Sequence, residues 1–193
     1  MTLHNSIIHS LYGAYRLACI DKGGFSYFNT DSTGFWHSFR ASILVFPLYT
    51  ITISSRWLAD TAEVSNWRFL LVHIISYVIS WTAFPVIMNW LCRVLNRRDN
   101  YIQLIIAYNW AAVLQSLIYL PIVFMGALGY DGLSSVSLIA FVLVVFYNFF
   151  IIYAALDISI SSALGIITLD LIIALVLGMW TELLTTNPII ISS

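Results

Sequence analysis

Residues 101–120 read YIQLIIAYNWAAVLQSLIYL, an apolar stretch of the length that crosses a lipid bilayer. The stretch also carries phenol and amide side chains, among them Tyr108, Asn109 and Gln115. Tyr101, Tyr108 and Gln115 follow one another at steps of seven residues, so on a helix they form a single stripe. The stretch therefore predicts a membrane-spanning helix with one face that is unsuited to lipid.

The composition extends this interpretation to the whole chain. Of its 193 residues, 61% are hydrophobic and only 9% are charged, whereas an average soluble domain is about 25% charged. The mean hydropathy is +0.91. These values predict a single membrane-embedded domain, and the net charge of −1 provides no basic field for nucleic acid.

Five segments are apolar enough, and long enough, to span a bilayer. The predicted spans are residues 38–58, 66–92, 101–128, 134–156 and 162–183. They make up a transmembrane domain over residues 37–185, which a cytoplasmic and interfacial segment (1–36) precedes and a short external tail (186–193) follows. The predicted fold class is all-α, a polytopic membrane helical bundle with five transmembrane helices and an N-terminal interfacial amphipathic helix.

The N-terminal segment shows apolar residues at three- and four-residue steps between Leu3 and Ala18. This pattern is typical of an amphipathic helix that lies in the membrane interface rather than across the bilayer. Residues 21–36 are expected to form a loop, with Asp31, Ser32 or Thr33 capping the helix that follows.

The basic residues predict the orientation, because Lys and Arg near the ends of spans are retained on the cytoplasmic side. The N-terminal segment, the entry to the first span and the second connection carry Arg16, Lys22, Arg40, Arg93, Arg97 and Arg98. The opposite side has only Arg56 and Arg68. We therefore expect a cytoplasmic N-terminus and an external C-terminus.

Three spans contribute polar side chains at a similar depth. Tyr108 and Asn109 lie about 12 Å from the cytoplasmic end of the third span, and Asn148 and Asp170 reach the same level on spans four and five. A carboxyl near a helix centre costs about 2.5–3.5 kcal/mol on insertion scales, so Asp170 should face inward and pair with an amide or a phenol. With Gln115, which lies deeper, these residues form a predicted polar layer that either bonds the helices together or lines a pathway.

Sequence signatures of catalysis are absent. The chain has no Walker loop, no HExxH and no GxSxG elbow, and Cys19 and Cys92 lack the spacing of metal ligands. His37 and His73 fall at opposite ends of their spans, which excludes a facing pair of haem ligands. The sequence therefore predicts no catalytic residue, no metal and no cofactor.

Three stretches carry a family resemblance. They are GAYRLACIDKGGFSYFNTDSTGFWHSFRAS (13–42), ISWTAFPVIM (79–88) and NYIQLIIAYNWAAVLQ (100–115). In this order they resemble inner-membrane proteins of alphaproteobacteria that are similar to the Yip family of five-span membrane proteins. The resemblance implies a bacterial inner-membrane location, a cytoplasmic N-terminal segment, a five-helix bundle and a non-enzymatic role. Charged residues expected in the fourth span of such relatives are replaced here by Asn148 and Tyr153.

Two hypotheses of function follow. The first is a non-enzymatic scaffold or accessory subunit that binds membrane lipids and a membrane-protein partner or further copies of itself. Arg93, Arg97 and Arg98 are its candidate contacts to lipid headgroups, at about 1 kcal/mol each. The second is a small-solute permease or proton-coupled carrier that uses the polar layer around Asp170.

Overall fold

The structure is a computed structural model that describes residues 3–59, 66–130 and 132–186. All secondary-structure elements within these residues are helices. The elements are α1 (Leu3–Ala18), the 3₁₀ helix η1 (Lys22–Tyr27), α2 (Ser32–Ser38), α3 (Arg40–Ala59), α4 (Asn66–Val94), the 3₁₀ helix η2 (Arg98–Asn100), α5 (Tyr101–Ala127), α6 (Ser134–Leu156) and α7 (Ile160–Thr186). By length and composition, four of the described helices, α4 to α7, are able to cross a membrane. This result supports an all-α membrane bundle. The predicted span over residues 38–58 corresponds to α3, which is not among these four helices.

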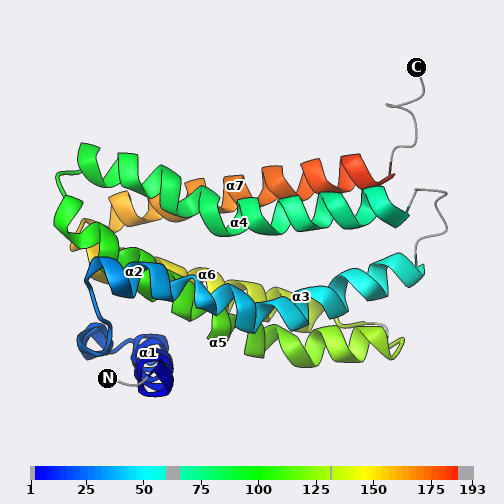
Figure 1. Ribbon diagram of the computed structural model, residues 1–193, viewed down its shortest axis with the longest axis horizontal. Coiled ribbons are helices and arrows are strands. Elements are labelled where there is room, and N and C mark those ends of the chain that lie inside the picture. The colour runs from blue at the N-terminus through cyan, green and yellow to red at the C-terminus, as the bar shows by residue number, and fades with distance from the viewer. Residues whose placement is uncertain (1–2, 60–65, 131, 187–193) are drawn as a thin grey trace.

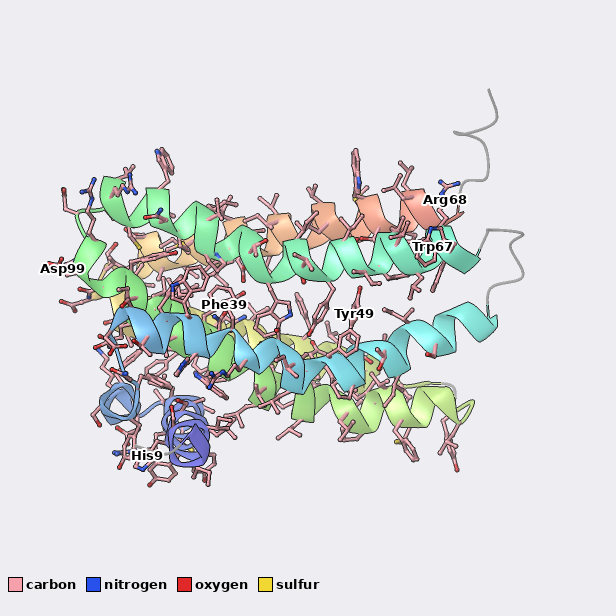
Figure 2. The ribbon with its side chains drawn as sticks, in the orientation of Figure 1. His9, Phe39, Tyr49, Trp67, Arg68 and Asp99 are labelled. Atoms are coloured by element: carbon pink, nitrogen blue, oxygen red, sulfur yellow. The ribbon has the colours of Figure 1, made fainter. Side chains whose placement is uncertain are left out.

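The long helices form two layers (Figure 1). One layer contains α4 and α7, which pack against each other, and the other contains α3, α5 and α6. Helix α6 ends and helix α7 begins at the short turn over residues 157–159, and the two helices separate away from this turn. Figure 2 labels Asp99 at the end where the layers meet, and Trp67 and Arg68 at the opposite end. We call these the Asp99 end and the Trp67 end.

The hydrophobic core lies toward the Asp99 end. Its buried members in the long helices come from the final turns of α4 and α6 and from the first half of α5 and the first turns of α7. They include Phe84, Met88, Cys92, Leu104, Ile105, Ile106, Trp110, Ile151, Ile152, Leu156, Ala163, Ile166 and Ile167. Toward the Trp67 end, large apolar side chains such as Leu175 and Leu138 are exposed, as in helices that face lipid. The two layers are therefore packed tightly at one end only.

The N-terminal residues form a compact module against the bundle. Helix α1 is seen end-on in Figure 1, so it runs across the direction of the long helices, and it contacts α5 and α6. The expected loop over residues 21–36 is wrong, because this stretch contains η1 and the start of α2. Of the three expected cap residues, Asp31 is a helix cap, but of α2 and not of the long helix that follows: its carboxylate accepts a 2.6 Å hydrogen bond from the Gly34 N–H.

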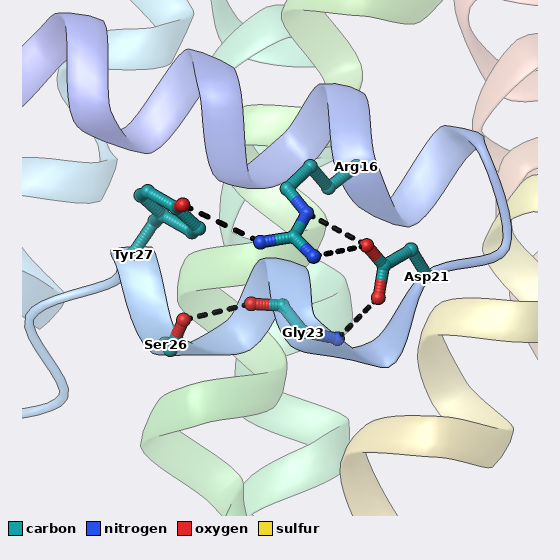
Figure 3. A network of polar contacts seen from close by, with 5 residues as sticks. All are labelled: Arg16, Asp21, Gly23, Ser26 and Tyr27. Carbon is teal, nitrogen blue, oxygen red and sulfur yellow. Dashed lines mark hydrogen bonds and ion pairs between the residues drawn. The ribbon is translucent and has the colours of Figure 1, made fainter.

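A polar network fixes η1 to α1 (Figure 3). The Arg16 Nε donates to Asp21 Oδ2 at 2.7 Å, and a second guanidinium nitrogen completes the ion pair. Another Arg16 nitrogen donates to the hydroxyl of Tyr27 at 3.3 Å. The second carboxylate oxygen of Asp21 accepts from the Gly23 N–H at 2.8 Å, which caps η1. One arginine thus connects both ends of η1 to α1.

Acid is expected to loosen this module. The Gly34 N–H lowers the pKa of Asp31, and the Gly23 N–H together with Arg16 lowers the pKa of Asp21, in both cases below the ordinary 3.8. A carboxyl whose pKa is depressed by folding stabilises the fold above its unfolded value and loses that contribution as the pH falls through its folded value. Protection of the Gly23 and Gly34 amides from hydrogen exchange, in detergent, should therefore decline below a pH of about 3.8.

The variant Asp31→Asn supplies the control for this titration. Asparagine also caps helices but does not titrate, so protection of the Gly34 amide should vary less with pH in this variant. If protection falls equally in both proteins, Asp31 is not the responsible group.

Candidate functional site

The carboxylate of Asp170 on α7 is paired with the phenol of Tyr108 on α5. The Tyr108 hydroxyl donates to Asp170 Oδ2 at 2.7 Å, as the sequence predicted for an inward-facing acid. The ring of Phe84 on α4 stacks on Tyr108 with centroids 4.1 Å apart. The pair therefore joins the two helix layers, with an aromatic side chain from α4 fixing the phenol.

Gln115 and Asn148 form a second pair, between α5 and α6. The Gln115 Nε2 donates to Asn148 Oδ1 at 2.6 Å. The depth along the spans predicts that Asn148 lies level with Tyr108, which is seven residues nearer the start of α5 than Gln115 is. Helical side chains lean toward the N-terminus of their own helix, and α5 and α6 are antiparallel, so Gln115 and Asn148 lean toward each other. The expected single layer is thus two separate pairs.

Asn109 has a third partner. Its Nδ2 donates to the Ser38 hydroxyl at 2.8 Å, and both side chains are buried. The Ser38 hydroxyl in turn donates to the carbonyl of Phe35 at 2.7 Å. Asn109 therefore attaches α2 to α5.

Tyr147, which neighbours Asn148, connects the bundle to the N-terminal module. Its hydroxyl donates a 2.6 Å hydrogen bond to the carbonyl oxygen of Ala14, in a buried position. This contact joins α6 to α1.

A small cavity of about 130 Å³ borders the Tyr108 side chain. It lies between α4 and α5 and is lined by Ser80, Trp81, Phe84, Pro85, Tyr108, Asn109, Ala112 and Gln115. At about 30 Å³ per water in the liquid, this volume is comparable to that of about four water molecules. Pro85 adds a polar backbone group, because it has no N–H to bond the carbonyl of Trp81 within the helix.

A larger cavity of about 320 Å³ lies between α3, α4 and α7 toward the Trp67 end. It is lined by Tyr49, Thr52, Ile53, His73, Ser76, Ser80, Ala174, Leu177, Gly178 and Thr181. The hydroxyls of Ser76 and Thr181 are 2.7 Å apart, and the Tyr49 hydroxyl donates to the carbonyl of His73 at 3.1 Å. Figure 2 shows Tyr49 between the two layers.

Ser80 lines both cavities, and Asp170 is connected to the smaller one through its hydrogen bond with Tyr108. We call the polar residues of this region the polar seam; its members are Tyr49, His73, Ser76, Ser80, Gln115, Tyr108 and Asp170. Sequence reasoning missed the part of the seam on α4. The available signal was the spacing of His73, Ser76 and Ser80, which recur at three- and four-residue steps on one helix face.

The predicted headgroup contacts lie at the Asp99 end. The Arg97 guanidinium donates at 2.7 Å to the carbonyl oxygen of Asp157, at the turn between α6 and α7. Arg93 donates to the side chain of Asn89 at 3.3 Å, and Arg98 is exposed at the start of η2. Arg97 therefore stabilises the end of α6, where a cation opposes the helix dipole.

The described residues contain no group of three or more His, Cys, Asp or Glu side chains that could hold a metal ion. Comparisons with protein-family models, characterised proteins and solved structures find no match to this chain. Its function is therefore inferred from the arrangement of its own residues.

Proposed function

We propose that this chain is a non-enzymatic protein of the bacterial inner membrane, with a Yip-like five-span architecture, that carries protons or a small polar solute along the polar seam. In this proposal the Asp99 end faces the cytoplasm and the Trp67 end faces the periplasm. The excess of Lys and Arg toward the Asp99 end supports this orientation.

The fifth span in this proposal is α3. Its 20 residues extend about 30 Å, which matches the hydrocarbon thickness of a bilayer, and it packs against α5. Helix α1 takes the interfacial position. Its direction across the long helices and the exposed side chains of Ile8, Tyr12 and Tyr15 on its outer face support that placement.

The observation that carries the proposal is the asymmetry between the two ends of the bundle. The hydrophobic core closes the Asp99 end, whereas the larger cavity lies between the layers toward the Trp67 end. Ser80 lines that cavity and also the small one beside Tyr108, whose hydroxyl bonds Asp170. An intramembrane carboxylate reached by polar groups from one side is the arrangement expected of a proton or solute carrier caught open to that side.

The Tyr108 and Asp170 pair supplies a physical coupling between protonation and the two layers. A charged carboxylate accepts a stronger hydrogen bond than a neutral carboxyl. Protonation of Asp170 therefore weakens its bond to the Tyr108 hydroxyl, which joins α7 to α5. The weaker bond allows the two layers to shift, and release of the proton restores it.

Proton uptake into liposomes that hold the purified protein and a trapped pH-sensitive dye tests this role. We expect Asp170→Asn to reduce the rate about tenfold or more, because the amide of asparagine cannot take up and release a proton as the carboxyl does. Thr168→Val is the matched control. Thr168 is exposed on the same helix, and its hydroxyl donates to the backbone carbonyl oxygen of Leu164. A native protein without uptake, or an Asp170→Asn variant with native uptake, rejects the carrier.

The scaffold or accessory-subunit function is a second candidate. Trp36 and Trp90 are 70% and 66% exposed in the half of the chain that packs at the Asp99 end, where large aromatic side chains suit contact with a partner or with headgroups. Purification in mild detergent tests it. A chain that always elutes alone, without a stoichiometric protein, lipid or second copy, counts against this function.

A further inference from the structure

An apolar groove opens between α3 and α4 toward the Trp67 end. Its volume is about 450 Å³, within the usual range for sites that hold small molecules. Its lining comprises Phe46, Tyr49, Thr50, Ile53, Ser54, Leu70, His73, Ile74, Tyr77 and Val78. Phe46, Leu70, Ile74 and Val78 are each about half exposed, so the groove is accessible from the side of the bundle.

The groove borders the larger cavity of the polar seam. Tyr49, Ile53 and His73 line both of them. A molecule that enters from the side thus meets apolar side chains first and the hydroxyls of Ser76 and Thr181 beyond them. The combined space is amphipathic, with its apolar part outward and its polar part between the layers.

The hydrogen bond between the Ser76 and Thr181 hydroxyls, in the larger cavity, has a defined direction. Thr181 donates to the carbonyl oxygen of Leu177 at 2.7 Å, so in its bond with Ser76 the serine is the donor. The Ser76 oxygen keeps acceptor capacity, because a hydroxyl oxygen has two lone pairs. The cavity lining therefore offers an acceptor to an incoming O–H group.

We propose that the groove and the larger cavity together bind a membrane-dissolved amphiphile with one apolar tail and an uncharged hydroxyl head, of the long-chain alcohol class. The tail lies in the groove between α3 and α4, and the head donates to Ser76. Such a molecule reaches the site from the bilayer, the medium against which the exposed apolar side chains of the groove lie. The site shares the larger cavity with the polar seam but contains neither Asp170 nor Tyr108, so photolabelling and proton uptake test the two proposals separately.

Photolabelling tests the site. Purified protein in lipid nanodiscs is irradiated with hexadecanol that carries a diazirine on its tail, and the labelled peptides are identified by mass spectrometry. We expect labels within residues 46–54 and 70–81, and competition by unlabelled hexadecanol but not by hexadecane. Ile53→Trp, which fills the junction of groove and cavity, should reduce labelling about tenfold.

Two further variants make the result specific. Val86→Trp places the same side chain at a position of α4 that is 69% exposed and away from the groove, and it should label like the native protein. Ser76→Ala keeps the shape of the site and should remove the preference for hexadecanol over hexadecane. If the Ser76→Ala variant keeps the preference for hexadecanol over hexadecane, the hydroxyl head does not donate to Ser76.

Three results would overturn the proposal as a whole. One is equal competition by hexadecane in the native protein, which would show that no head is recognised. Another is equal loss of label in Val86→Trp and Ile53→Trp, which would place the label on the general lipid-facing surface. The last is an unlabelled groove in a protein that elutes as a dimer, which would assign the groove to a second copy of the chain.

Discussion

Replacing Gly34 with alanine is expected to lower the stability of the protein by more than about 3 kcal/mol. An ideal Cβ at this position would lie 1.7 Å from the backbone carbonyl oxygen of Asn29 and 2.7 Å from its carbonyl carbon. Those atoms belong to the chain immediately before α2, which Asp31 caps through the Gly34 N–H. Neither side can give way without breaking the cap, so α2 should detach and take Ser38 away from Asn109.

Thermal unfolding in detergent measures this effect, and Gly165→Ala is the control. Gly165 lies inside α7 with no atom within 4 Å of its ideal Cβ, so alanine there should stabilise the helix by up to about 1 kcal/mol. Opposite shifts in the melting temperature are therefore expected. Similar melting temperatures for the two variants would show that the chain before α2 tolerates a side chain at Gly34.

The second large effect is expected from Leu17→Ala. Leu17 is fully buried where α1 meets η1, beside the close approach of Gly13 and Gly24. A Cβ on Gly24 would lie 2.5 Å from the carbonyl oxygen of Gly13, so the two backbones leave little space for other atoms to refill a cavity. Truncation of a buried leucine costs about 2–5 kcal/mol, and a site that cannot collapse lies at the upper end of that range.

Hydrogen exchange across α1 reports this loss, because the helix should detach before the bundle unfolds. Ile8→Ala is the matched variant, since Ile8 is 52% exposed on the other face of the same helix. It should leave the exchange rates of α1 nearly unchanged in detergent. Equal acceleration in both variants would mean that helix propensity, and not the docking of Leu17, controls α1.

The sequence predicted the long helices well because their apolar runs are continuous and their ends are polar. The predicted span over residues 134–156 coincides with α6, whereas Asp31 caps α2, a short helix that precedes the span for which a cap was expected. Asp170 was expected to pair with a phenol or an amide because a carboxylate in a bilayer has few alternatives, and it pairs with Tyr108.

Other features depend on distances that no local pattern encodes. The partners Ser76 and Thr181 are 105 positions apart, and Gln115 and Asn148 meet through the lean of their side chains. The helical structure within residues 21–36 was missed because glycines and aromatic residues there suggested a loop. Gly24 and Gly34 instead allow two backbones to touch, which requires knowledge of the neighbouring segment.

The hydrogen bond from Tyr147 to Ala14 connects residues 133 positions apart, and it affects how the protein is made. A ribosome adds about 5–20 residues per second, so the first helix emerges roughly 7–27 s before the tyrosine that anchors it. During that interval α1 cannot yet dock on the bundle, and its exposed Ile8, Tyr12 and Tyr15 side chains give it affinity for the bilayer surface. Docking of the first helix would then be a late step of biogenesis, after synthesis of α6.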